Sequence, residues 1–563
     1  MKKIVSILLS LMAGTVLFAG PADPSPHDYT QPDGSVVRYY MHGDEYLHWM
    51  TDGSGACIEI GEDGYVHPAQ VPSEARFNAA ARRRAGQTRF RMAENRGLTG
   101  EHHFCVILVD FADVKFTKTQ EQFESFFNGT GTSSGSTGSV KEYWTDQSDG
   151  MFIPTFDVYG SYTVSKNISE FINDSDGLLR EVINIADEEI YFQNYKHTSS
   201  VESVIMVFAG HSAAMGAPNS IWPHQGGISN LSADGVAIKS YCCAPELQGD
   251  SGTTIAGIGH VCHEFGHCLG LPDIYDTQRS SHSGNAKAPV YWYSVMDHGN
   301  YSNYSKTPPP LSMLEKYLCG WVDFNDNEVV ESVTSSGVKT LKEIGQKSGL
   351  RALRINTDRD GEFFLCEFRS INPSVNKWGA SLPKGGMIVY HVDRSSGHWT
   401  SDDAVSMNTD PDHPNLYLVN ASDPDAITLY ANAKNADWPS YPFPGSRNVS
   451  SFNPHSWSGT DTYVSLTGMP NIGATSANKS ISVRAHVRTF PLINNSKKGV
   501  YNAEDIFVLK LSPGYHQEDG LSVSAWRFDG QSASDSVNLT SGTHTIEADL
   551  SDGRKLRLAI SVK

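Results

Sequence analysis

An H-E-x-x-H-x-x-G-x-x-D pattern that begins at His263 constrains this chain more than any other feature. On a helix, residues i and i+4 lie one above the other, so His263 and His267 can present two imidazoles to one metal ion. Glu264 then points beside that ion, where a base can take a proton from water. Gly270 can adopt a positive φ, which lets the helix end and the chain turn back, so that Asp273 can become a third ligand. The pattern predicts a zinc site with three protein ligands and one open position, as in catalytic rather than structural zinc sites.

The residues before His263 favour a buried helix that carries this pattern. Residues 255–262 are mostly apolar, and Thr253 or Thr254 is a candidate N-cap. H-E-x-x-H alone recurs by chance in long chains, so a structural zinc site and a helix with two coincidental histidines are the alternatives. The apolar stripe expected to face the core comprises Ile255, Ile258, Cys262 and Phe265.

A second feature is the segment Tyr293–Gly299, which carries Met296 at its centre. A methionine turn here can supply an adaptable apolar floor beneath the two imidazoles. By itself, a methionine before a turn is more often an ordinary core residue, but its place shortly after the zinc pattern gives it more weight. Tyr293, His298 and Tyr301 are candidates to stabilise charge in a transition state, and the sequence assigns this role to none of them.

The zinc pattern and the methionine turn together resemble those of the immune inhibitor A family, a metzincin-like group of secreted bacterial zinc metalloproteases. The resemblance covers approximately residues 35–490. It implies a zinc endopeptidase made with a propeptide, with His263, His267 and Asp273 as the Zn2+ ligands and Glu264 as the base. Further segments that carry the resemblance are 105–116, 138–160, 207–224, 311–321, 361–370 and 385–393.

The resemblance also raises Ca2+ as a second cofactor, because such enzymes often carry an acidic stretch before the strand at 207–210. In this chain the corresponding residues 195–202 offer few oxygen ligands. Asp174–Gly177 and Asp358–Gly361 are short acidic turns that do not complete an EF-hand loop. The sequence therefore supports no specific calcium site, and solvated turns are the better interpretation.

The N-terminus predicts export. Residues 1–20 form a signal peptide, with Lys2 and Lys3 before an apolar run and a cleavage site near Ala19 or Gly20. No later stretch reaches the roughly 20 apolar residues of a membrane span.

The formal net charge is −19, and basic residues form no stripe with interleaved aromatic residues, which disfavours nucleic-acid binding. We expect a secreted protein, in the periplasm, at the cell surface or in the medium, that acts on proteins or peptides.

Residues 21–97 are predicted to be a small β-rich propeptide. They end in a polar segment with Arg82, Arg83 and Arg84 in a row, which is an accessible site for proteolytic release. The alternative is a permanent N-terminal domain with a basic linker. Cys57 could hold the zinc before activation, but its surroundings resemble a strand, and a buried structural cysteine is the better interpretation.

The remaining chain divides into three predicted parts. Residues 98–325 alternate strands and helices and should form an α/β (α+β) metzincin-like catalytic domain. Residues 326–490 show strands separated by turns, as in a β-sandwich, and residues 491–563 show a similar rhythm that predicts a small immunoglobulin-like β-domain. The predicted function is zinc-dependent hydrolysis of peptide bonds. The alternative is a secreted binding protein or adhesin with a degenerate protease domain, and the intact Glu264 argues against it.

Overall fold

We describe the protein from a computed structural model of the whole chain of 563 residues. The predicted signal peptide lies outside the described residues up to position 16, and so do the three consecutive arginines of the predicted processing site. The structure describes residues 17–18, 20–44, 47–61, 63–73, 76, 97–201, 203–217, 219–276, 289–395, 399, 407–408, 410, 413–424, 437–487, 493, 501–511, 522–551, 553 and 555–563.

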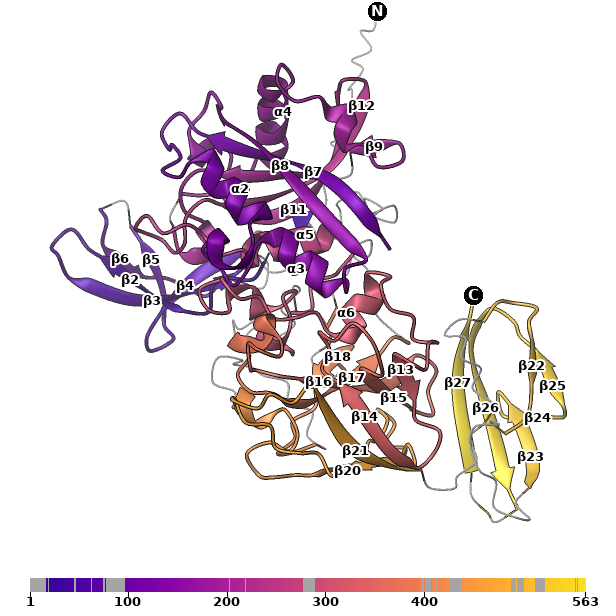
Figure 1. Cartoon of the computed structure of the whole chain (residues 1–563). Coiled ribbons are helices and arrows are strands. Elements are labelled where there is room, and N and C mark those ends of the chain that lie inside the picture. Colours follow the sequence, from indigo (N-terminus) through magenta and orange to yellow (C-terminus); the bar gives the residue numbers. More distant parts are fainter. Residues whose placement is uncertain are drawn as a thin grey trace, which may run out of the picture.

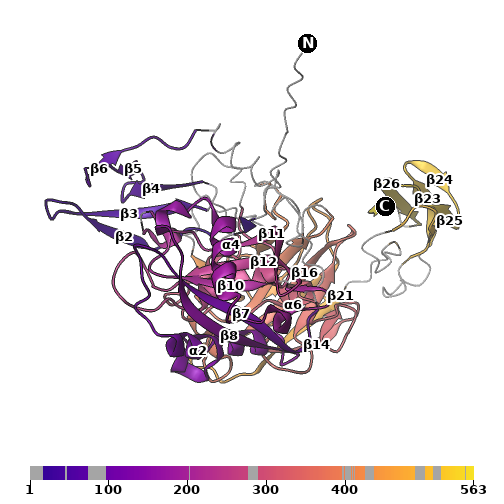
Figure 2. The ribbon, with the colours of Figure 1, turned by 90° about the horizontal axis from the view of Figure 1, so that it is seen from above.

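The chain forms a mixed α/β structure of several sheets and few helices, which confirms the predicted fold class at this level. The largest sheet and its helices are formed by the N-terminal half of the chain. A small sheet of residues 26–68 projects from one side, and the C-terminal strands lie on the opposite side in both views (Figures 1 and 2). Among the described residues, no helix is both long and apolar enough to cross a membrane.

The main sheet has seven strands in the order β1-β11-β12-β10-β7-β8, with β9 beside β12. Strands β7, β8, β10 and β12 are parallel, whereas β11 is antiparallel to β12 and β1 is antiparallel to β11. The bounds are β1 (Leu17–Phe18), β7 (Gly100–Asp110), β8 (Phe152–Thr163), β9 (Ser200–Val201), β10 (Val204–Phe208), β11 (His224–Ala233) and β12 (Val236–Pro245).

Both faces of this sheet are covered. Alternate residues of β7 belong to different cores: Val106 and Leu108 pack with α2, α3 and α5, while Ile107 and Val109 pack with α4 on the other face. A strand that is buried on both sides reads as a continuous apolar run, as the sequence of β7 does. The helices are α2 (Gln120–Asn128), α3 (Val140–Gln147), α4 (Ser175–Ala186), α5 (Gly259–Cys268) and α6 (Met313–Leu318).

Local capping fixes where several of these helices begin. Thr119, Ser139 and Ser312 each form a capping box at the start of α2, α3 and α6, in which the hydroxyl and the side chain three residues later satisfy backbone N–H groups. Asp174 caps α4 by accepting a hydrogen bond from the Gly177 N–H. The first of the two acidic turns in the sequence is therefore a helix cap.

Strands β2–β6 form a separate antiparallel sheet in sequential order. This sheet contacts the predicted catalytic domain of residues 98–325, called the catalytic part below. The contact is a small apolar core that includes Tyr39 and Met41 from the sheet and Ala214 and Trp222 from the catalytic part. The bounds are β2 (Pro26–Thr30), β3 (Val36–Gly43), β4 (His48–Asp52), β5 (Cys57–Ile60) and β6 (Val66–Pro68).

Two sheets follow the catalytic part and enclose a common core. One of them also packs against the catalytic part: Leu365 and Tyr390 share a core with helix α5, whereas Cys366 and Val389 face the second sheet. The five-stranded sheet contains β13 (Val330–Ser332), β15 (Ala352–Asn356), β16 (Glu362–Arg369), β17 (Gly386–Asp393) and β18 (Leu416–Leu418), and the four-stranded sheet contains β14 (Gly337–Lys342), β19 (Ser451–Phe452), β20 (Val464–Thr467) and β21 (Ser480–Val487).

The C-terminal residues form a small all-β unit with its own core. A four-stranded antiparallel sheet has the order β24-β23-β26-β27, and β22 pairs with β25. The bounds are β22 (Ile506–Val508), β23 (Val523–Phe528), β24 (Gln531–Ala533), β25 (Ser536–Asn538), β26 (Gly542–Leu550) and β27 (Lys555–Val562).

Candidate metal centre

Helix α5 carries the H-E-x-x-H residues in the interior of the protein, and all of its residues are buried. The helix begins at Gly259, so the prediction of a start near residue 255 with a threonine cap is wrong. Residue Ile255 instead forms an antiparallel bridge with Leu247. A Cβ on Gly259 would lie 1.9 Å from the carbonyl oxygen of Asn300, so the helix can begin here only because this residue has no side chain.

The structure brings the three predicted ligands together. Their candidate ligand atoms all lie within 4.8 Å of one another. Asp273 Oδ1 is 3.3 Å from Nε2 of His263 and 3.3 Å from Nε2 of His267, and the two Nε2 atoms are also 3.3 Å apart. Gly270 adopts a φ of +94°, as expected of the residue that turns the chain after the helix.

Hydrogen bonds on the far side of each ring fix the tautomers of the two histidines. The Nδ1–H of His263 donates to the carbonyl oxygen of Val295 at 2.7 Å, and the Nδ1–H of His267 donates to that of Leu271 at 2.8 Å. A carbonyl oxygen can only accept, so each ring has its proton on Nδ1 and, when neutral, a lone pair on Nε2. Burial lowers the pKa of His263, which favours this neutral form.

The chemistry of these atoms fits a bound cation. Two imidazole lone pairs and a carboxylate oxygen face one another, and Asp273 Oδ1 is buried without a hydrogen bond from any described residue. Converging acceptors of this kind repel one another unless a cation lies between them, and histidine nitrogen with carboxylate oxygen is a donor set that zinc accepts.

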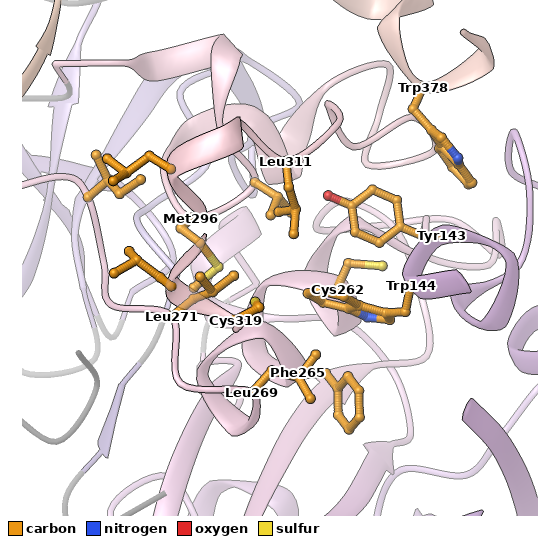
Figure 3. Close-up of a cluster of buried hydrophobic side chains, with 14 of the residues drawn as sticks. Tyr143, Trp144, Cys262, Phe265, Leu269, Leu271, Met296, Leu311, Cys319 and Trp378 are labelled. Atoms are coloured by element: carbon orange, nitrogen blue, oxygen red, sulfur yellow. The ribbon is translucent and has the colours of Figure 1, made fainter. Parts of the chain in front are cut away.

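Met296 lies beneath the helix, as the methionine turn predicts. It is fully buried, and a Cβ on Gly266 would lie 2.7 Å from its Sδ, so the glycine within H-E-F-G-H allows this close packing. Figure 3 shows Met296 beside Leu271 in a cluster that also contains Trp144 and Phe265. The N–H of Ile274, next to Asp273, donates to the carbonyl oxygen of Met296 at 2.9 Å and ties the third ligand to the turn.

Glu264 is 1% exposed and lies on the same helix beside the candidate ligands. Its Oε1 accepts a hydrogen bond from the N–H of Gly20 at 3.0 Å. The carbonyl oxygen of Gly20 in turn accepts from Nε1 of Trp222 at 2.9 Å. A segment from the N-terminus therefore contacts the candidate base.

The three candidates for transition-state stabilisation differ in position. The Tyr293 hydroxyl donates to the carbonyl oxygen of Lys384, and Nδ1 of His298 bonds to Asp297 Oδ1 at 2.7 Å. The Tyr301 hydroxyl donates instead to the carbonyl oxygen of Pro21 at 2.6 Å, next to the residue that contacts Glu264. Of the three side chains, Tyr301 is therefore the one that contacts the N-terminal segment beside Glu264.

Sequence reasoning missed Gly20, which contacts Glu264, and it missed Trp222 and Asn300, which lie beside Gly20. A Cβ on Gly20 would lie 3.1 Å from Asn300 Nδ2 and 3.6 Å from Cδ2 of His263. Asn300 follows the methionine turn closely, which is a local signal. Trp222 and Gly20 are far from the zinc pattern in sequence, and no spacing rule points to them.

Comparisons with known proteins agree with this site. Residues 207–317 match the family model described as the immune inhibitor A peptidase M6 catalytic domain. The pre-pro-metalloprotease PrtV of Vibrio cholerae serotype O1, in strain M66-2 and in strain ATCC 39315 / El Tor Inaba N16961, is 28% identical over 202 residues, which cover 29% of this chain. The alignment spans only 21% of the length of PrtV. The segment that carries the candidate metal centre thus matches the catalytic domain of the immune inhibitor A peptidases of type M6, the family that the motifs resemble.

Proposed function

We propose that this protein is a secreted zinc-dependent endopeptidase. The observation that carries the proposal is the convergence of two imidazole Nε2 atoms and Asp273 Oδ1 within 4.8 Å, next to the carboxylate of Glu264. The family match over residues 207–317 and the description of PrtV as a metalloprotease support the same chemistry. His263, His267 and Asp273 are the proposed ligands.

In the proposed mechanism, His263, His267 and Asp273 would hold the zinc ion, which would supply Lewis-acid chemistry by lowering the pKa of a water molecule and polarising the carbonyl of the peptide bond. Glu264 accepts the proton from the attacking water and then delivers it to the nitrogen of the departing amine. The hydrogen bonds of His263 to Val295 and of His267 to Leu271 hold the two rings in orientation throughout the reaction. Met296 supports the rings from below without a polar role.

Strand β11 would become the edge of the main sheet once the predicted signal peptide, which includes β1, is removed, and this edge would offer a surface for the main chain of a protein substrate. It is antiparallel to β12, and β1 already pairs with its outer edge. Pairing of this kind uses backbone groups and so binds extended peptides of varied sequence. We therefore propose unfolded or flexible protein segments as the substrate class.

The proposed route to the active enzyme begins with export and removal of the signal peptide 1–20. Release of residues 21–97 as a propeptide would follow, by cleavage near the arginine-rich segment. The sheet β2–β6 supports this proposal because it is a separate unit that contacts the catalytic part through a small core. The β-sandwich of residues 326–490 shares a core with helix α5, and we expect it to remain with the enzyme.

The test is digestion of a denatured protein by the processed enzyme, with and without a zinc chelator, followed by peptide mapping. We expect cleavage that the chelator abolishes and that added zinc restores. A Glu264→Ala protein that retains zinc should be inactive. Cleavage at the parental rate by Glu264→Ala would contradict the proposed chemistry, and loss of all cleavage in the processed parent would favour the binding-protein alternative.

A further inference from the structure

Asn300 is a buried side chain beside the candidate base, and the protein leaves part of its hydrogen-bonding capacity unused. It is 1% exposed, and its Oδ1 is buried without a hydrogen-bond partner among the described residues. An unpaired buried amide costs free energy, so native structures keep few such groups and each requires an explanation. Asp273 Oδ1, the oxygen of a proposed zinc ligand, is a buried acceptor of the same kind. The comparison favours a functional role for Asn300 as well.

The main chain of Asn300 is held tightly at the start of helix α5. Asn300 belongs to the 3-10 helix η6 (His298–Tyr301), which follows the methionine turn. A Cβ on Gly259 would lie 1.9 Å from the carbonyl oxygen of Asn300, and a Cβ on Gly299 would lie 2.2 Å from that of Ser294. These close backbone contacts leave η6 little room to shift. The Asn300 side chain is therefore held in a fixed place, as preorganised catalytic donors are.

The Nδ2 atom of Asn300 faces the catalytic centre. An ideal Cβ on Gly20 marks a point that is 3.1 Å from Asn300 Nδ2, 3.5 Å from Glu264 Oε1 and 3.6 Å from ring carbon Cδ2 of His263. Side chains from η6 and α5 thus surround one point, next to the proposed base and the first proposed ligand. In the processed enzyme, a substrate bound between these side chains is within hydrogen-bonding reach of Nδ2.

Peptide hydrolysis benefits from a neutral donor at this place. When water attacks the carbonyl carbon, a bond forms between them, and the electron pair of the C=O double bond moves onto the oxygen, which becomes negatively charged. An amide N–H stabilises this charge without losing its own proton, so Glu264 alone transfers the proton from water to the amine. The Tyr293 hydroxyl, a candidate for this role from the sequence, donates to the carbonyl oxygen of Lys384 instead.

We propose that Asn300 is a catalytic residue whose Nδ2 donates to the carbonyl oxygen of the scissile peptide bond and stabilises the negative charge that develops on it. This inference rests on the proposed peptidase function. Because the charge exists only during the reaction, loss of the donor should lower kcat more than it changes KM. Because Oδ1 is unpaired in the free protein, loss of the amide should not weaken the fold.

The first test compares the kinetics of Asn300→Ala and Asn376→Ala in the processed, zinc-loaded enzyme. Asn376 is also buried, but its Oδ1 accepts from the N–H of Trp378 at 3.1 Å and its Nδ2 donates to Glu343 at 2.9 Å. We expect Asn300→Ala to lower kcat by about 10²–10³-fold with little change in KM. Asn376→Ala should keep the parental kcat. A parental kcat in Asn300→Ala would overturn the proposal.

Urea denaturation of the full chain measures the structural role of the same two asparagines. Asn376→Ala breaks two hydrogen bonds, so we expect a lower denaturation midpoint than in the parent. Asn300→Ala should have the parental midpoint or a higher one, because its Oδ1 has no hydrogen bond to lose among the described residues. A fall in the midpoint of Asn300→Ala as large as that of Asn376→Ala would show that Asn300 supports the fold, and would overturn the proposal.

Asn300→Asp separates the donor from the shape of the side chain. The ionised carboxylate has nearly the size of the amide but no N–H, so we expect kcat to fall at least as far as in Asn300→Ala. A parental kcat in Asn300→Asp would contradict the role of Nδ2. The parent in the same assay separates this inference from the proposed function. If the parent and both Asn300 variants cleave equally fast, only the role of Asn300 is wrong, whereas a processed parent that does not cleave contradicts the peptidase proposal and this inference together.

Discussion

The Nδ1–H of His263 donates to the carbonyl oxygen of Val295 at 2.7 Å, which joins the first proposed ligand directly to the methionine turn. The adjacent Met296 packs against helix α5 at Gly266. The carbonyl oxygen of Met296 accepts from Ile274, beside Asp273. The turn therefore orients one ligand, supports the helix and positions the segment that carries the third ligand. We expect the site to depend on this turn as much as on the ligands themselves.

Glu264→Gln should separate metal binding from proton transfer. The amide has nearly the shape of the carboxylate but cannot accept the proton from water, so we expect the rate constant of peptide cleavage to fall by about 10²–10⁴-fold. The zinc content should stay at the parental value because Glu264 is not a proposed ligand. The check is steady-state kinetics together with metal analysis on the same sample. A loss of zinc in proportion to activity would mean that Glu264 holds the metal.

Gly259→Ala should destabilise the catalytic part strongly. The new Cβ would lie 1.9 Å from the main-chain oxygen of Asn300, and backbone cannot move aside as a flexible side chain can. We expect a loss of unfolding free energy of about 1–3 kcal/mol or more, which urea denaturation can measure. Gly473→Ala is the control, since a Cβ there meets nothing within 4 Å. Equal midpoints for the two variants would show that the contact with Asn300 is not rigid.

The contact between the catalytic part and the β-sandwich should depend on a buried ion pair. Arg369 and Glu367 are both fully buried and 2.7 Å apart, and Arg369 Nη1 also donates to the carbonyl oxygen of Tyr293 at 2.7 Å. Arg369→Met leaves the Glu367 carboxylate without its cation, so we expect a loss of about 3–5 kcal/mol of unfolding free energy. The double variant Arg369→Met, Glu367→Gln should recover part of this loss. A single variant as stable as the parent would contradict the role of the pair.

The stability of the catalytic part should fall in acid because of His224. This side chain is buried, and burial lowers its pKa to about 4 from 6.5. As the pH falls, His224 in the unfolded chain therefore binds a proton near pH 6.5, whereas His224 in the folded chain binds it only near pH 4. The neutral His224 side chain therefore contributes about 3 kcal/mol to the free energy of unfolding above pH 6.5. This contribution is lost as the pH falls towards 4. Urea denaturation at pH 7.5 and pH 5 should show a smaller pH effect for His224→Gln than for the parent, and identical pH effects would contradict this assignment.

Local sequence rules account for much of the fold and for the ligand geometry. The i, i+4 spacing places His263 and His267 together, and Gly270 has the positive φ that the turn towards Asp273 requires. Capping boxes identify the starts of α2 and α3 because they act within four residues. The start of α5 was not predictable in this way. It has no side-chain cap and is fixed by the contact of Gly259 with Asn300.

Contacts between distant segments could not be predicted from the sequence. The hydrogen bond from Gly20 to Glu264 joins residues 244 positions apart, and no local propensity encodes such a pair. Strand β16 is predicted as a sandwich strand, yet Leu365 packs on the catalytic part while Cys366 faces the second sheet. Only the run Phe363–Cys366 within β16 is apolar on both faces, and it is the one local sign of this double burial.

The most direct test of the proposed metal centre is the zinc content of the processed protein. We expect about one zinc ion per chain by inductively coupled plasma mass spectrometry in the parent, and a loss of most of it in Asp273→Ala. Asp187→Ala, at an exposed position after α4, is the control and should retain zinc. Stoichiometric zinc in the parent that persists in Asp273→Ala, or a folded and active parent without zinc, would contradict the assignment of His263, His267 and Asp273 as the ligands.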